Sequence, residues 1–303
     1  LSMNWRDQIG KVGYRVGFNL SDSQSKIVKY NSNESGILTS TLSNGSTFWN
    51  YYEGKDLGEI WGYEYDGFYT VDDFTDTSSW KLKDGVPSID GYNPRPGDVK
   101  FKNLMDDDRG TNMISSGDNT VSNPGDRKVI GNNTPRYLYG ITLGANFKGF
   151  DLNVFMQGTG KRDTWIANNL KFPLYSDFKF IALYKDLSNY WKPVDAANGD
   201  YTAANPNAEF PRIYGNYGNQ GSNYRQSDKY LSDASYFRIK NVTLSYTFPK
   251  AWIAKASLSQ LKAFVSIENL ATFSSLPKGI DPETLSWNYP AFRTVSFGLN
   301  VTL

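Results

Sequence analysis

The alternation of apolar and polar residues at the end of the chain constrains its fold most strongly. In residues 293–303 every second residue is apolar: Val295, Phe297, Leu299, Val301 and Leu303. The residues between them are small or polar. Successive side chains of a β-strand point to opposite faces, so this segment predicts a strand with one apolar and one polar face. Such a strand suits an ordinary sheet, and it equally suits the wall of a membrane barrel.

The same alternation predicts further strands in other parts of the chain. They span residues 10–20, 139–147, 150–157, 236–248 and 261–273. Lys148 and Gly149 separate two of these segments, and a two-residue connection that contains glycine predicts an antiparallel hairpin. The dominant architecture is therefore predicted to be all-β and antiparallel.

Three less regular segments give weaker predictions. Residues 26–30 follow a short polar turn and are expected to begin a return strand. Residues 56–70 combine aromatic residues with glycines and are expected to form an aromatic strand. Residues 180–191 place apolar side chains at helical spacing, which predicts a short amphipathic helix.

The predicted connections alternate between short and long. Residues 71–135 and 159–233 read as long loops, whereas the connections at residues 21–25 and 148–149 are short. Loops of that length count against a compact soluble domain. A soluble sandwich has turns about every 8–12 residues, whereas a membrane barrel has tight turns on one rim and large loops on the other. The alternation of short and long connections therefore favours a membrane barrel over a soluble sandwich.

The composition excludes several classes of function. The chain carries 32 Lys and Arg against 31 Asp and Glu, so its net charge favours neither nucleic acid nor an acidic partner. It contains neither Cys nor His, which removes disulfides, thiolate metal sites and the commonest general base. No Gly-x-Ser-x-Gly motif and no nucleophile–base pair is present, so an enzyme is the least favoured class. The chain begins without a signal peptide and is expected to be an interior piece of a longer protein.

A series of short motifs runs through the chain in order. They are Gly62-Tyr63-Glu64-Tyr65-Asp66-Gly67, Pro96-Gly97-Asp98-Val99-Lys100-Phe101, Asp126-Arg127-Lys128-Val129-Ile130-Gly131, Lys148-Gly149-Phe150-Asp151-Leu152, Asn205-Pro206-Asn207-Ala208, Phe210-Pro211-Arg212, Ser235-Tyr236-Phe237-Arg238-Ile239-Lys240-Asn241-Val242-Thr243-Leu244, Glu268-Asn269-Leu270, Gly279-Ile280-Asp281-Pro282-Glu283 and the final strand. The ordered set resembles the C-terminal third of the SusC/RagA family, the TonB-dependent transporters that import glycans or peptides across the outer membrane.

The resemblance implies a fold and a location. It implies that residues 1–303 are the C-terminal portion, about seven strands, of a 22-stranded antiparallel transmembrane β-barrel with long extracellular loops. The plug domain, the TonB-contacting region and the earlier strands would lie outside this sequence. Seven strands leave unpaired edges that cannot face hydrocarbon, so a preceding segment is expected to complete the barrel.

The resemblance also implies a function and partners. It implies TonB-dependent import of a nutrient across the cell outer membrane, most simply an oligosaccharide, together with a SusD-like surface lipoprotein. A peptide importer of the RagA type is the alternative within the family. A soluble all-β carbohydrate-binding module is the alternative from another class.

Several aromatic residues are candidates for contact with substrate or partner. Aromatic faces stack on sugars and tyrosine hydroxyls supply hydrogen bonds, although packing under a lid lipoprotein or an interfacial girdle would use the same residues. The candidates are Trp61, Tyr63, Tyr65, Trp165, Tyr214 and Tyr217.

An acidic loop gives the one candidate metal site. At this position the family pattern resembles a calcium loop, and oxygen ligands suit Ca²⁺. The candidate ligands are Asp106, Asp108, Asp118 and Asp126. Met105 and the insertion at residues 115–124 break the required spacing, so a solvated acidic loop is the competing interpretation. No other cofactor is predicted.

Overall fold

The computed structural model describes residues 1–43, 47–89, 91–105, 112–166, 171–172, 185–214, 222–286 and 291–303. The chain divides into two compact units. The first, the sheet unit, comprises Leu1–Gln24, Thr134–Asp163 and Asp233–Leu303. The second, the loop unit, comprises Ser25–Asn133 and Thr164–Ser232. Within the described residues, no helix is both long and apolar enough to cross a bilayer.

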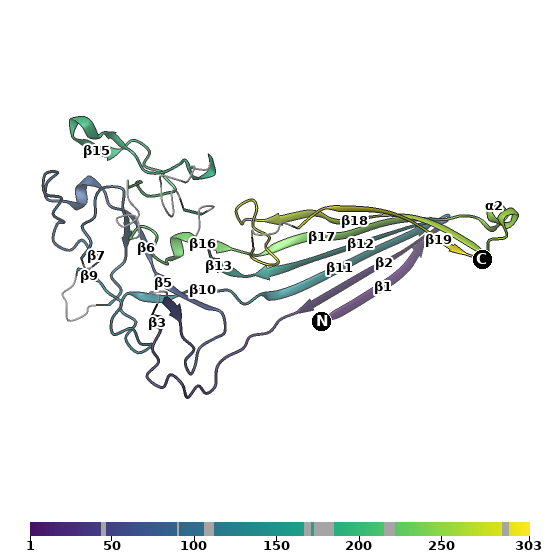
Figure 1. The fold of residues 1–303 in the computed structure, drawn as a ribbon, viewed down its shortest axis with the longest axis horizontal. Helices are drawn as coiled ribbons and strands as arrows, with labels where there is room; N and C mark the ends of the chain where they lie inside the picture. The colour runs from purple at the N-terminus through teal and green to yellow at the C-terminus, as the bar shows by residue number, and fades with distance from the viewer. Residues whose placement is uncertain are drawn as a thin grey trace. The chain divides into compact units, whose positions relative to one another are not determined.

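The sheet unit is built on seven antiparallel strands that lie side by side (Figure 1). In sheet order they are β1 (Ser2–Ile9), β2 (Val12–Ser21), β11 (Arg136–Phe147), β12 (Phe150–Lys161), β17 (Tyr236–Thr247), β18 (Gln260–Ser274) and β19 (Thr294–Thr302). The sheet order follows the chain order, which is the pattern of an up-and-down barrel wall.

The register of the seven strands aligns the apolar residues into continuous rows. One row, from β1 to β19, consists of Trp5, Val16, Leu143, Val154, Val242, Ile267 and Val295. The adjacent row on the other face consists of Arg6, Arg15, Gly144, Asn153, Thr243, Ser266 and Ser296. The apolar face is not covered by the rest of the unit, since Phe297 is 80% and Leu299 67% exposed. This confirms the predicted partition into an apolar and a polar face.

If the apolar face contacts lipid, as the sequence predicts, a charge on it should destabilise the protein. We expect Phe297→Arg, near the middle of β19, to cost about 2–4 kcal/mol and to lower the yield of folded, heat-modifiable protein in outer-membrane fractions. The matched control is Ser296→Arg, which places the same charge one residue away on the polar face. Equal losses for the two variants would contradict the assignment of the faces.

The connections alternate between short and long, but the short turn predicted at residues 21–25 is instead the beginning of the long connection from β2 to β11. The turn at Lys148 and Gly149 has positive φ angles at both residues, 47° and 90°, as a type I′ hairpin requires. Gly10 turns the chain between β1 and β2, and α2 (Lys250–Ile253) with η5 (Ala254–Ala256) joins β17 to β18. The long connections follow β2, β12 and β18. Because the strands alternate in direction, these long connections leave the sheet at the same end.

Glycines on the polar face make room for long polar side chains. The Arg15 guanidinium crosses Gly144 and donates a hydrogen bond to Asn153 Oδ1 on β12. A Cβ atom on Gly144 would overlap with the Arg15 side chain. The small residue on β11 thus allows a polar contact across two strand spacings.

Two strand predictions were wrong, and one strand was missed. Residues 26–30 form only a bridge from Lys26 to Asp56, because β2 pairs directly with β11 and leaves no place for a return strand. Strand β1 was not predicted, since Asp7 interrupts its short apolar pattern. The aromatic segment at residues 56–70 is not a barrel strand. It forms β5 (Glu59–Tyr63) and β6 (Tyr65–Phe68) in the loop unit, paired with β10 (Arg127–Asn132) and β8 (Val99–Phe101).

The remaining elements are short. They are β3 (Thr39–Thr41), β4 (Thr47–Trp49), η1 (Val71–Asp73), β7 (Ser88–Ile89), β9 (Met113–Ile114), β13 (Asp163–Trp165), η2 (Lys185–Leu187), β14 (Pro193–Asp195), η3 (Ala196–Asn198), β15 (Asp200–Ala203), η4 (Asp228–Tyr230) and β16 (Leu231–Asp233). The helix predicted at residues 180–191 lies partly outside the described residues, and its described part contains the single 3₁₀ turn η2.

Candidate functional site

Aromatic side chains form the cores of the loop unit. Four clusters of buried residues are present: Phe172, Leu187, Phe210, Tyr224 and Tyr230; Tyr63, Val99, Phe101 and Ile114; Leu38, Tyr52 and Trp61; and Tyr69, Phe74 and Trp80. Two of the candidate contact residues, Trp61 and Tyr63, are each only 8% exposed within these clusters. Their burial favours the packing role that the sequence analysis left open.

One buried carboxylate organises the polar part of the loop unit. Asp98 is fully buried, and its oxygens accept hydrogen bonds from the Arg95 backbone N–H (2.7 Å), the Tyr214 hydroxyl (2.6 Å) and Asn223 Nδ2 (3.0 Å). Asn223 in turn accepts a hydrogen bond from the Val99 N–H (2.8 Å). Burial raises the pKa of Asp98, whereas the hydrogen bonds from Tyr214 and Asn223 oppose that shift.

The local sequence explains why the carboxylate lies where it does. Arg95 to Asp98 form a turn closed by a hydrogen bond from the Asp98 N–H to the Arg95 carbonyl (3.0 Å). Pro96 fits the second position of a type II turn, and Gly97 supplies the positive φ (90°) that the third position requires. The Arg212 N–H donates to the Gly97 carbonyl (2.8 Å), which docks a distant segment on the turn.

A cavity of about 460 Å³ lies beside this turn. It is lined by Trp80, Gly91, Tyr92, Asn93, Arg95, Tyr201, Arg212 and Tyr214. We call it the Asp98 cavity, because Asp98 holds Tyr214 and the backbone of Arg95. The described part of its lining contains aromatic rings and two guanidinium groups but no aliphatic side chain. Such a lining can bind a ligand, and it contains no nucleophile with an adjacent base.

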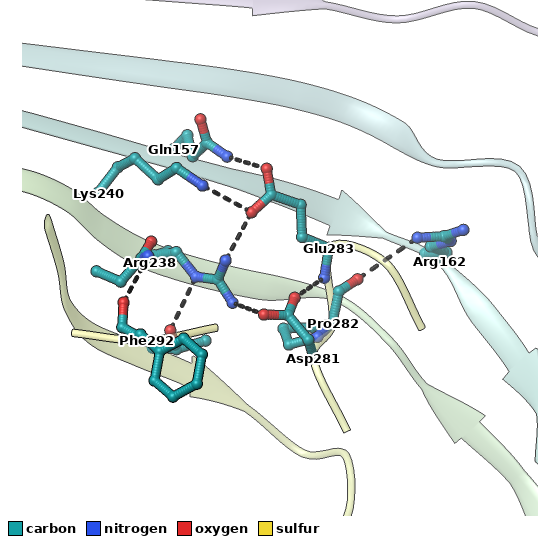
Figure 2. Close-up of polar contacts among 10 residues, drawn as sticks. Gln157, Arg162, Arg238, Lys240, Asp281, Pro282, Glu283 and Phe292 are labelled. Atoms are coloured by element: carbon teal, nitrogen blue, oxygen red, sulfur yellow. Dashed lines mark hydrogen bonds and ion pairs between the residues drawn. The ribbon is translucent and has the colours of Figure 1, made fainter. Parts of the chain in front are cut away.

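A second cluster fixes a connection of the sheet unit to the polar face of the sheet (Figure 2). Arg238 on β17 is 2% exposed, and its guanidinium donates to Asp281 Oδ2 (2.8 Å) and Glu283 Oε2 (2.6 Å). Its Nε also donates to Thr272 Oγ1 on β18 (2.9 Å). Arg238 therefore joins the connection after β18 to two strands at once.

Glu283 extends this cluster to a third strand. Its Oε2 also accepts a hydrogen bond from Lys240 Nζ (2.9 Å), and its Oε1 accepts one from Gln157 Nε2 on β12 (3.0 Å). The side chains of Arg238 and Asp281 are 3% and 8% exposed, so this is a buried ion pair rather than a surface one. We call the group of Arg238, Asp281 and Glu283 the Arg238 clamp.

Comparisons with known proteins agree on one family. TonB-dependent receptor P3 of Formosa agariphila is 27% identical over 308 residues, which cover 95% of this chain and 26% of P3. TonB-dependent receptor P26 of the same organism is 23% identical over 240 residues, or 74% of this chain and 21% of P26. The solved structure of the RagAB peptide importer in the closed-closed state matches 99% of this chain and 28% of the importer chain, with a TM-score of 0.62 and 19% identity. The chain is therefore similar in sequence to TonB-dependent receptors, and it has the fold of the corresponding part of the RagAB importer.

The comparisons cover only part of each relative. No protein-family model matches the chain. The chain spans about a quarter of the length of the relatives it matches, and its seven-stranded sheet is the corresponding part of an outer-membrane barrel. The relatives are named as receptors and importers, in keeping with the prediction that the chain is not an enzyme.

Among the described aromatic candidates, one lines the Asp98 cavity. Tyr214 lines it, whereas Tyr217 lies outside the described residues. Trp165 packs on Phe172 with ring centroids 5.6 Å apart. Contact of these residues with substrate or partner stays a prediction.

Sequence analysis missed the charged residues of the cavity. Arg95, Asp98 and Arg212 were not candidates, although the motifs that contain Asp98 and Arg212 were recognised as a resemblance. The signal that could have found them is a Pro-Gly-Asp turn, because an acid that follows such a turn is placed to accept backbone hydrogen bonds.

Asp126, one of the candidate calcium ligands, already has backbone partners. It is fully buried and accepts hydrogen bonds from the N–H groups of Leu104 (2.6 Å), Met105 (3.0 Å) and Ser115 (2.7 Å). These bonds use both of its oxygens to hold two segments of the loop together. Its position therefore has a structural explanation that requires no metal ion.

The other candidate calcium ligands are not gathered around Asp126 in the described residues. Asp118 is exposed and accepts hydrogen bonds from the N–H (3.0 Å) and hydroxyl (2.6 Å) of Thr120. Asp106 and Asp108 lie outside the described residues. Among the residues that are described, no group of three or more potential ligands could hold a metal ion. The calcium site stays a prediction.

Lys229 should titrate far below an ordinary lysine. Its Nζ lies 4.1 Å from the centre of the Tyr65 ring and 4.6 Å from that of Phe68, and burial lowers its pKa to about 8. Between about pH 8 and 10.4 the unfolded chain then binds more protons than the folded one, so the free energy of unfolding rises with pH across this window. NMR of reductively ¹³C-methylated receptor, with Lys229→Met to assign the signal, should give a midpoint near 8. A midpoint near 10.4 would contradict the predicted effect of burial.

Proposed function

We propose that the receptor to which this chain contributes imports an oligosaccharide across the outer membrane. The observation that carries the proposal is the alignment of apolar residues on one face and polar residues on the other across all seven strands. Such a sheet separates lipid from an aqueous lumen. The exposure of Phe297 and Leu299 argues against the alternative of a soluble carbohydrate-binding module, which would bury large apolar side chains in a core.

The proposal includes the parts that complete the transporter. A plug domain and the earlier strands would belong to the same protein, TonB would supply the energy, and a SusD-like lipoprotein would cap the long loops. The RagAB structures support a partner of this kind, because they are complexes of an importer with a second component. The polar face of β1 to β19 would form part of the lumen wall, and the loop unit would contact substrate and lipoprotein.

A peptide importer is the second candidate, and the structural similarity to the RagAB peptide importer supports it. The lining of the Asp98 cavity favours an oligosaccharide, because aromatic and hydrogen-bonding groups suit a hydroxylated ring, whereas apolar peptide side chains require aliphatic contacts. Calcium held by Asp106, Asp108, Asp118 and Asp126 remains a further proposal within the same loop unit.

Uptake by cells tests the function. Cells that express the full-length receptor should accumulate fluorescent oligosaccharides, and deletion of the receptor or of TonB should abolish the uptake. Fluorescent peptides of similar mass form the comparison arm. Uptake of peptides alone would replace the oligosaccharide proposal with the second candidate, and uptake that persists without TonB would overturn both.

A further inference from the structure

We propose that the Asp98 cavity binds an anionic sugar, through a carboxylate or sulfate group held by Arg95 and Arg212. This inference rests on the proposed import of an oligosaccharide and names the chemical class of that oligosaccharide. It assigns a role to two arginines that the packing of the loop unit does not require.

Both guanidinium groups lack an acidic partner within the described part of the chain. The Arg95 guanidinium donates to the Pro94 carbonyl (3.0 Å) and lies 5.9 Å from the Trp80 ring centre. The Arg212 guanidinium lies 4.8 Å from the Tyr214 ring centre. The described residues accept no further hydrogen bond from the two guanidinium groups, and the planar arrangement of donors in arginine matches a carboxylate or a sulfate.

The nearby carboxylate does not neutralise them through a direct ion pair. Asp98 is fully buried and does not line the cavity, and its three donors are a backbone amide, a hydroxyl and a side-chain amide. Asp98 instead positions Tyr214 and the backbone of Arg95 by accepting a hydrogen bond from each. Among the described residues, the lining of the cavity thus contains two positive charges and no negative one, which favours an anionic ligand.

The aromatic wall is fixed in advance of binding. The Trp80 ring lies between Phe74, at 5.3 Å and an interplanar angle of 85°, and Tyr201, at 4.8 Å and 90°. Trp80 also has a φ of 56°, a backbone conformation that a bulky residue adopts at a cost of about 1–3 kcal/mol and that is found most often at functional sites. A fixed wall loses little entropy when a ligand binds.

The volume and chemistry of the cavity suit a sugar ring. Its volume of about 460 Å³ lies within the usual range of small-molecule sites, about 300–1,000 Å³. The exposed Asn93 supplies hydrogen-bonding groups for hydroxyls, and the partly exposed Tyr201 ring, supported by the buried Trp80, supplies flat apolar surface. An acidic peptide could satisfy the arginines but would leave this surface without a matching ring.

Binding to the purified full-length receptor in detergent tests the inference. The probes are an oligogalacturonate, which carries carboxylates, a carrageenan oligosaccharide, which carries sulfates, neutral maltohexaose, and hexaglutamate. We expect calorimetry to detect binding of one of the two anionic sugars, weakened by added salt. Which of them binds identifies the anionic group.

The variants assign that binding to the cavity. Arg95→Gln and Arg212→Gln should each weaken it about tenfold or more, because each removes charge-assisted hydrogen bonds. Arg212→Lys keeps the positive charge but loses the planar pair of guanidinium donors, so its affinity should lie between those of wild type and Arg212→Gln. Lys83→Gln, which removes an exposed cation that does not line the cavity, should leave the affinity unchanged. Heat modifiability on gels verifies that every variant is folded.

Three outcomes would overturn the inference: no binding of either anionic sugar, equal affinity in wild type and both glutamine variants, or binding of hexaglutamate alone. Cells that import a neutral oligosaccharide with TonB, while the receptor binds no anionic one, would refute the inference and leave the proposed function intact. Cells with no TonB-dependent oligosaccharide uptake would refute the proposed function itself.

Discussion

Arg238→Met should release the connection after β18 from the sheet and destabilise the receptor by about 3–5 kcal/mol. Arg238 is the buried cation between Asp281 and Glu283, at 2.8 and 2.6 Å. Removing it leaves Asp281, whose side chain is 8% exposed, as an uncompensated buried charge. We expect faster proteolytic cleavage within residues 275–286 and a lower melting temperature in detergent.

Two further variants distinguish the stability lost to the uncompensated buried charge from the stability lost to poorer packing. In Arg238→Met combined with Asp281→Leu the uncompensated charge is absent, so part of the lost stability should return. Lys240→Met removes only the partly exposed contact to Glu283 and should cost at most about 1 kcal/mol. Equal effects for Lys240→Met and Arg238→Met would show that the Arg238 clamp is not what holds the connection.

Asp98→Ala should unfold the turn at residues 95–98 and disorder the Asp98 cavity. The substitution leaves three donors, the Arg95 N–H, the Tyr214 hydroxyl and Asn223 Nδ2, without their acceptor. Each unsatisfied buried donor costs about 1–3 kcal/mol, so the expected local loss is several kcal/mol. Hydrogen exchange measured by mass spectrometry should increase in the peptides that contain residues 92–102 and 210–214.

The control for Asp98→Ala is Tyr214→Phe, which removes one donor and leaves the carboxylate with its other two. It should cost about 1 kcal/mol and leave the protection of residues 92–102 nearly unchanged. Neither variant should alter exchange in β17 or β18, because every partner of Asp98 lies in the loop unit. Wild-type protection in Asp98→Ala would contradict the organising role of the carboxylate.

The strands of the barrel wall were predictable because their determinant is local. A period of two residues identifies β11, β12, β17 and β19 from neighbouring residues alone, and the connection at Lys148 and Gly149 identifies their hairpin. The segment at residues 56–70 has similar local chemistry, but its pairing with β10 depends on residues more than 60 positions away. Sequence alone could not separate a loop-unit strand from a wall strand, because both require the same local pattern.

The cavity was less predictable, because its parts converge from distant segments. Asp98 meets Tyr214 and Asn223 across more than 110 residues. The sequence identified Tyr214 by its aromatic character, but a local pattern contains no information about which acid it contacts. The Arg238 clamp could not be predicted for the same reason. The motifs around Arg238 and Asp281 were recognised separately, but neither motif indicates that the two side chains are in contact.

The direct pairing of β2 with β11 makes the wall independent of what lies between them. Residues 25–133 can lengthen, shorten or be exchanged while every partner in the sheet keeps its register, because closing a longer connection adds only about 0.6 kcal/mol per doubling of its length. Residues 164–232 contribute to the same loop unit and to the Asp98 cavity, so a new cavity would require matched changes in both connections. Both connections can change without altering the pairing of the wall strands, so the sheet and the loop unit can evolve at different rates.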